Sequence, residues 1–311
     1  MKKFMIKLII LLIICSIFIA IYCNIATIAT KKYNGSSTAE QISMSFKNSI
    51  SDNYNCYFLG NSRIYRDINP DIFYTVNAYN FGHDNDSYNQ MYYKLLYLLD
   101  NNKKIDYLII GTDYFQFSFL SDTRNYAYSK LFSEDYSVDF GETSWLDRQE
   151  SYYTSLWTNK QNALLSCVYL FFQKDVPKNI NYQKENGQYI VYGNANPDDT
   201  IDRDYTILDI QYKYFKWIID LCETKGIELY VIMPPLWKGE TLSHTDKERK
   251  QFDDMILNEL KDTPYNNHYV NYSAENGLLP YTDFIDVTHL TPEAADRYSE
   301  FLNNKIFIEK E

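Results

Sequence analysis

Histidine and cysteine are scarce in this chain, whose 311 residues include four histidines and five cysteines. Three cysteines, Cys56, Cys167 and Cys222, follow the apolar N-terminus, and none belongs to a Cys-x-x-Cys pair. An odd number without paired spacing argues against a disulfide framework and against a zinc site. All three lie in apolar stretches, so we expect them to be buried thiols.

Basic residues are also in short supply beyond the N-terminus. Removing the three lysines at positions 2, 3 and 7 leaves 27 Lys and Arg against 41 acids, a net charge of −14 for residues 31–311. Such a domain excludes nucleic acid as a natural partner, and it repels a polyanionic polymer unless a local basic groove exists. The 31 tyrosines offer stacking platforms for sugars, although a biased composition explains them more simply.

A long apolar run is present at the N-terminus. Lys7 and Lys31 enclose 23 uncharged residues, which as a helix span roughly 34 Å, enough to cross a hydrocarbon core of about 30 Å. We predict a transmembrane signal-anchor over residues 1–30, with cleavage after Ala29 as the alternative. The flanking lysines point the N-terminus weakly into the cytoplasm. The remainder is expected to be an extracytoplasmic domain on the cell membrane.

The rest of the sequence predicts one domain with a large insertion. Residues 31–54 are polar and resemble a stalk with some helix. Residues 55–303 are expected to form the domain, and residues 304–311 a C-terminal tail. Regular patterning lapses over about 113–204, a stretch too long for a plain loop, which predicts a cap or lid beside the site.

Short apolar runs alternate with helical periodicity through this domain. Strands are predicted at 55–60, 74–82, 105–111, 188–193, 227–235 and 268–272. Helices are predicted at 87–99, 161–172, 205–225, 245–261 and from Thr291 onward. The alternation predicts an α/β fold, a three-layer α/β/α sandwich around a parallel sheet.

Ligands of open parallel sheets bind beyond the carboxyl ends of the strands. That rule selects four loops, which carry Ser62, Gly82, Asp113, and the pair Asp286 and His289. A serine hydroxyl needs a general base within hydrogen-bond reach, and that base needs an orienting partner. We therefore predict Ser62 as nucleophile, His289 as base and Asp286 as the residue that fixes the imidazole tautomer.

These motifs resemble a known superfamily. The strand followed by "GNSR" (60–63), the glycine loop after the second strand, "GTD" (111–113) and the late "DVTHL" (286–290) before a final helix are similar to the SGNH/GDSL-like hydrolases. The resemblance covers about residues 53–112 and 205–303. It extends to membrane-anchored members that act on surface polymers, such as the D-alanyl transfer proteins of lipoteichoic acid synthesis and the alginate-acetylation proteins.

The resemblance implies a flavodoxin-like sheet, a Ser-His-Asp triad and an oxyanion hole. In the superfamily that hole is made by the serine N–H, a glycine N–H after the second strand and an asparagine side chain after the third. Gly82 is an approximate match for the glycine, and Asp113 occupies the place of the asparagine. An ionised carboxylate donates no hydrogen bond, so one donor is missing, which slows such chemistry by about 10²–10³-fold.

Each candidate also has a plain structural interpretation. Ser62 suits a helix N-cap, Gly82 a turn, and Asp113 a structural role. His83 precedes a helix rich in local acids, and we expect it at the surface.

Two hypotheses follow from the sequence. The first is an O-acyl transferase or esterase that modifies a surface glycan or teichoic-type polymer through a serine acyl-enzyme. It needs no metal or organic cofactor, and the resemblance implies a membrane-bound O-acyltransferase as the acyl donor. The second is a non-enzymatic, degenerate fold that binds glycan or scaffolds a partner.

Overall fold

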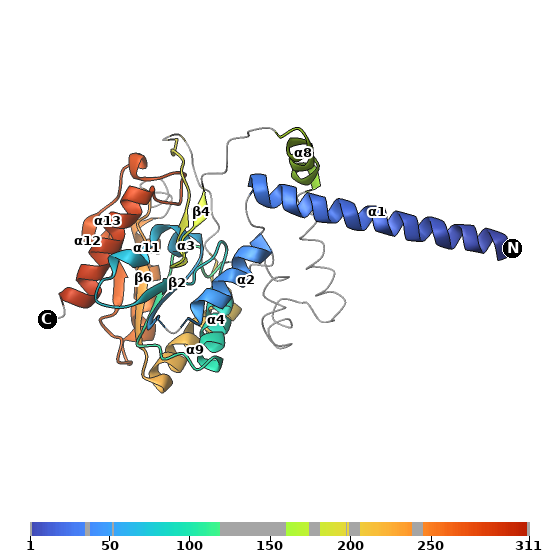
Figure 1. Ribbon diagram of the computed structural model, residues 1–311. Helices are drawn as coiled ribbons and strands as arrows, with labels where there is room; N and C mark the ends of the chain where they lie inside the picture. The colour runs from blue at the N-terminus through green and yellow to red at the C-terminus, as the bar shows by residue number, and fades with distance from the viewer. Residues whose placement is uncertain are drawn as a thin grey trace.

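Five short strands pair in parallel in the computed structural model, in the order β2-β1-β3-β6-β7 (Figure 1). They are β1 (Cys56–Leu59), β2 (Ala78–Asn80), β3 (Tyr107–Gly111), β6 (Glu228–Met233) and β7 (Tyr269–Asn271). The structure describes residues 2–34, 38–51, 53–118, 160–173, 181–196, 198, 206–237 and 245–309. The predicted α/β class with a parallel sheet is confirmed.

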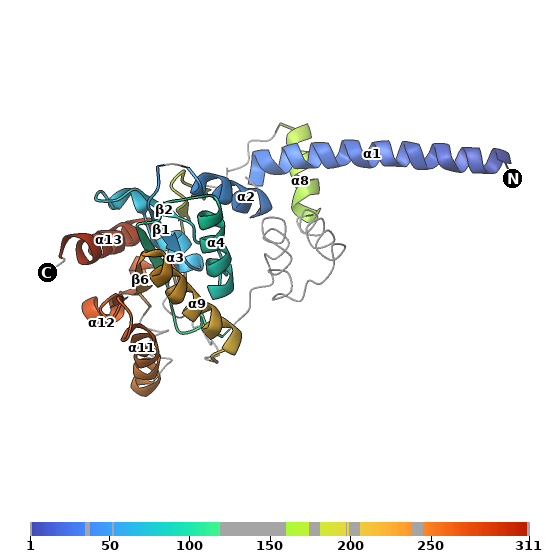
Figure 2. The same cartoon turned by 90° about the horizontal axis from the view of Figure 1, so that it is seen from below.

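Helices cover both faces of this sheet (Figures 1 and 2). One face packs against α2 (Thr38–Ser49), α4 (Tyr88–Asp100), α9 (Asp209–Lys225) and α11 (Asp246–Leu260). The other packs against α3 (Ser62–Asp67), α13 (Pro292–Asn303) and the π-helix η3 (Asn304–Ile308). Smaller elements are η1 (Pro70–Ile72), α12 (Tyr272–Asn276), η2 (Tyr281–Asp283) and a hairpin of β4 (Tyr182–Gln183) and β5 (Tyr189–Ile190).

The central strands are apolar on both sides because both sides are covered. In β1, Tyr57 and Leu59 join the core beneath α4 and α9, whereas Cys56 and Phe58 join the core beneath α13. Parallel sheets buried in this way read as continuous apolar runs rather than as an alternation. That is why the strand predictions succeeded at the centre of the sheet.

Side-chain caps define where several helices begin. A reciprocal pair of hydrogen bonds between Thr245 and Glu248 starts α11, and Thr291 caps α13 ahead of Pro292. Gly226 ends α9 in the left-handed conformation, with φ of 66°. These signals are local, so they could be identified in the sequence.

Residues from both segments predicted to flank the domain are buried in its core, and one cysteine is less buried than expected. Part of the expected stalk is α2, whose Ile42 and Phe46 are buried in the core. The expected tail continues as η3, which buries Ile306. Cys167 is only partly buried, unlike Cys56 and Cys222, so the prediction of three buried thiols was wrong for that residue. Much of the predicted insertion lies outside the described residues.

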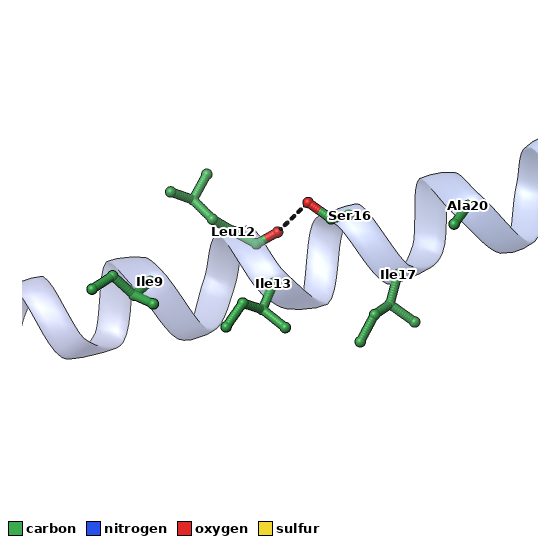
Figure 3. Close-up of a pocket in the computed structure, with 6 residues that line it drawn as sticks. All are labelled: Ile9, Leu12, Ile13, Ser16, Ile17 and Ala20. Carbon is green, nitrogen blue, oxygen red and sulfur yellow. Dashed lines mark hydrogen bonds between the residues drawn. The ribbon is translucent and has the colours of Figure 1, made fainter.

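The N-terminal helix α1 (Lys2–Asn34) projects away from the domain (Figures 1 and 2). Its segment Lys2–Ala26 is long and apolar enough to cross a membrane, and none of the most apolar part is buried. Figure 3 shows six residues along this apolar helix: Ile9, Leu12, Ile13, Ser16, Ile17 and Ala20. The Ser16 hydroxyl donates to the Leu12 carbonyl oxygen, so its polar group is satisfied within the helix, as a lipid environment requires.

Candidate active site

Three side chains from distant parts of the chain form a continuous hydrogen-bonded row. Ser62 Oγ lies 2.7 Å from His289 Nε2, and His289 Nδ1 lies 2.8 Å from Asp286 Oδ2. Ser62 is half-buried and His289 is buried, with 9% of its surface exposed. The arrangement has the connectivity of a nucleophile, a general base and an orienting carboxylate.

The position of Ser62 follows from the junction of β1 and α3. Asn61 caps α3, because its Oδ1 accepts from the Arg63 N–H, and Ser62 is therefore the first helical residue. Ile64 lies against Gly60 and Gly111, where an added Cβ would come within 2.3 Å of Ile64 Cγ1 in either case. Both glycines allow α3 to approach the sheet edge closely, which sets Ser62 at the carboxyl end of the strands.

The loop that carries His289 is held largely by hydrogen bonds to its own carboxylate, Asp286. Asp286 Oδ1 accepts hydrogen bonds from the backbone N–H groups of Thr288 and His289, at 2.8 and 3.0 Å, and from the Thr288 hydroxyl at 2.9 Å. The Ile285 N–H donates to the His289 carbonyl oxygen and closes the loop. The three-residue spacing of Asp286 and His289 therefore has a structural cause: one carboxylate fixes both the loop and the imidazole.

Burial, assisted by the neighbouring Arg66, favours the neutral form of the His289 imidazole. Burial lowers the pKa of His289 below its ordinary value, and the Arg66 guanidinium, with Nη1 3.3 Å from His289 Nδ1, lowers it further against the opposing effect of Asp286. Burial acts to raise the pKa of Asp286, but the hydrogen bonds from His289 and Thr288 outweigh it and hold that pKa below its usual range. At neutral pH the pair is thus a carboxylate and a neutral imidazole, the state in which histidine accepts a proton.

Sequence reasoning missed a buried acid that joins the two sides of the site. Asp67, at the end of α3, accepts a hydrogen bond from the Leu290 N–H at 3.0 Å, next to His289. Burial raises the pKa of Asp67 well above its usual value. The motifs give no signal for this contact, because Asp67 and Leu290 are 223 positions apart.

The two proposed oxyanion residues are engaged within the protein. The Gly82 N–H donates to Asn80 Oδ1 at 3.1 Å. Asp113 is buried; its Oδ2 accepts from Asn61 Nδ2 at 2.7 Å and lies 3.7 Å from Arg63 Nε. Asp113 therefore contacts both residues that flank Ser62, Asn61 and Arg63, and anchors them from the end of β3.

His83 is buried rather than exposed, so the expectation of a surface position was wrong. Its ring stacks on Tyr65, with centroids 4.8 Å apart, and only 2% of its surface is accessible. The acids that follow His83 in the sequence favoured a surface position. In the fold, the Tyr65 side chain of α3 covers the His83 ring.

Among the residues that the structure describes, no group of three His, Cys, Asp or Glu side chains is placed to hold a metal ion. The chain matches no protein-family model, and a search of curated proteins finds no relative. The feature of the molecule that points to a function is the geometry of Ser62, His289 and Asp286.

Proposed function

We propose that this protein is a serine-dependent ester hydrolase or O-acyl transferase of the SGNH-like type, tethered to the membrane by α1. The observation that carries the proposal is the hydrogen-bonded row from Ser62 Oγ through His289 to Asp286. Ser62 is half-buried rather than fully buried, which is compatible with the approach of a small acyl ester.

The proposed reaction has two steps, acylation and deacylation of Ser62. Ser62 Oγ attacks the acyl carbonyl as His289 Nε2 takes its proton, and collapse of the tetrahedral intermediate expels an alcohol that receives this proton. His289 then deprotonates an acceptor hydroxyl or water, which attacks the acyl-serine, and the imidazolium returns this proton to Ser62 Oγ as the acyl–serine bond breaks. Asp286 keeps the Nδ1 proton in place and stabilises the imidazolium between the steps.

The acceptor we propose is a hydroxyl of a surface glycan or teichoic-type polymer, and the acyl donor a membrane-bound O-acyltransferase. A tethered domain suits both, because α1 keeps the site near the bilayer in which such a donor resides. The acidic surface favours a neutral glycan over a polyanion.

The test is covalent labelling of the full chain in detergent with a fluorophosphonate, a reagent that phosphonylates activated serines. We expect Ser62→Ala to abolish labelling and Ser51→Ala, at an exposed position outside the site, to leave it unchanged. If the Ser62→Ala chain is still labelled to the same extent, Ser62 is not the nucleophile.

One pair of observations favours the alternative, a non-catalytic fold that binds glycan or scaffolds a partner. Gly82 and Asp113 are held by internal hydrogen bonds and offer no donor to a developing oxyanion. The Ser62 N–H, in the first turn of α3, is the donor that remains for that role. A wild-type chain that takes no label, together with full cellular function after His289→Ala, would establish this alternative.

A further inference from the structure

The helix α8 (Lys160–Phe171) presents an apolar face that the domain does not cover. Its exposed side chains, including those of the turn that follows it, are Leu164, Leu165, Val168, Phe171 and Phe172. Phe171 has 83% of its surface accessible and Phe172 has 65%. Adjacent exposed aromatic and aliphatic side chains of this kind indicate an interaction surface rather than isolated surface residues.

The sequence of this helix is unusual for the domain that contains it. Residues 161–173 include no charged side chain, although residues 31–311 carry a net charge of −14. Water-facing helices elsewhere in the chain, such as α11, carry acids and bases along their exposed faces. With no charge after Lys160 at its first position, α8 avoids the cost of desolvating ionised groups in lipid along the rest of its length.

The opposite face of α8 packs on the membrane-facing helix. Ser166 of α8 is 2% exposed, and on α1 Ala29 is fully buried while Cys23 and Ala26 are partly covered. These α1 residues overlap the C-terminal end of the apolar segment Lys2–Ala26. The exposed apolar face of α8 is therefore continuous with the surface that α1 presents to lipid.

The two views show how α8 is oriented. It lies across the C-terminal third of α1 rather than along it, foreshortened in Figure 1 and seen from the side in Figure 2. When α1 is perpendicular to the bilayer, α8 lies close to the membrane plane. Interfacial helices adopt this orientation, with their apolar face about 5–10 Å into the boundary between head groups and acyl chains.

We infer that α8 is a second membrane contact, an interfacial helix whose exposed apolar face is covered by the acyl chains of a phospholipid bilayer. The inference requires α1 to span the bilayer and is independent of the chemistry at Ser62. A single spanning helix leaves the domain free to swing, whereas two contacts restrict its orientation above the membrane.

The experiment uses the full chain in phosphatidylcholine vesicles, with and without bromine on the acyl chains, because bromine quenches tryptophan only at contact. Phe171→Trp is the reporter and Leu164→Trp is a second reporter on the same helix. Phe18→Trp, in the apolar segment of α1, is the lipid-facing reference. Tyr74→Trp, 74% exposed near η1, is the water-facing reference. The signal of the four native tryptophans, measured on the wild-type chain, is subtracted.

We expect the added fluorescence at positions 171, 164 and 18 to lose most of its intensity in brominated vesicles, and that at position 74 to keep it. Reporters on α8 that behave like position 74 overturn the inference. Blue-shifted but unquenched emission at positions 164 and 171 also overturns it, since a protein surface then covers the face. If Phe18→Trp is not quenched, α1 does not lie in the bilayer, and the inference is overturned because it requires α1 to span the membrane. None of these results depends on whether Ser62 reacts, so a failed labelling experiment and a failed membrane contact are distinguishable.

Discussion

The two sides of the candidate active site are held by different means. On the serine side, the residues flanking Ser62 are fixed by Asp113, a buried group some fifty positions away. On the histidine side, Asp286 accepts hydrogen bonds from its own neighbours, Thr288 and His289. The serine side is therefore held by contacts with a residue distant in sequence. The histidine side is held mainly by hydrogen bonds within its own loop.

This difference has an energetic consequence. A change on the serine side disturbs buried charges and so acts on the stability of the domain. A change on the histidine side alters an imidazole that the loop holds in place, and so acts on reactivity more than on stability. Substitutions on the serine side and on the histidine side can therefore separate the effect on stability from the effect on reactivity.

Asp286→Asn should produce the largest change on the histidine side. The amide can stabilise the wrong imidazole tautomer, and in a serine triad such a replacement lowers the rate by roughly 10⁴-fold. We expect the fluorophosphonate labelling rate to fall by that order while the melting temperature of the full chain in detergent changes little. A rate close to that of the wild type would show that Asp286 serves only to shape the loop.

Asp113→Ala should have the largest effect on the serine side. It removes the carboxylate beside the buried Arg63 and Asn61, and breaking a buried charged pair costs about 3–5 kcal/mol. We expect a clear drop in the melting temperature. The control is Asp254→Ala on α11, which breaks an exposed pair with Lys250 and costs about 0.3–0.5 kcal/mol. Equal effects of the two substitutions would contradict the anchoring role.

Thr288→Ala tests how much the loop depends on a side chain of its own. The Thr288 hydroxyl lies 2.9 Å from Asp286 Oδ1 and 3.0 Å from His289 Nδ1. Loss of one hydrogen bond of about 0.5–1.5 kcal/mol should slow labelling by about 2–10-fold. Thr288→Ser keeps the hydroxyl and should restore most of the rate. If serine does not rescue, the methyl group and not the hydroxyl holds the loop.

Arg66→Gln should leave the rate at neutral pH nearly unchanged and move its pH dependence. Labelling needs neutral His289, so the rate falls as the pH drops through the pKa of that residue, which burial and Arg66 hold below its ordinary value. Removing the guanidinium raises this pKa, so the midpoint of the pH–rate profile should shift upward. Arg66→Lys keeps the charge and should shift it less. A midpoint that stays in place or moves down would show that Arg66 does not tune the base.

Sequence reasoning succeeded where the determinants are local. The Asp-x-x-His spacing, the cap at Thr291 and the apolar run of β3 are each visible within a few residues, and the structure brings Ser62, Asp286 and His289 together. It failed where the determinants are tertiary. Nothing near Asp113 in the sequence shows that it pairs with Arg63, and nothing near His83 shows the Tyr65 ring above it.

Because Ile64 lies close to Gly60 and Gly111, the position of Ser62 on α3 depends on the absence of a side chain at these two glycines. A methyl group added at either glycine would come within 2.3 Å of Ile64 Cγ1, so we expect α3 to move away from the sheet edge and the Ser62–His289 distance to lengthen. Graded substitutions at these two glycines therefore offer a way to measure how the reactivity of Ser62 depends on its distance from His289.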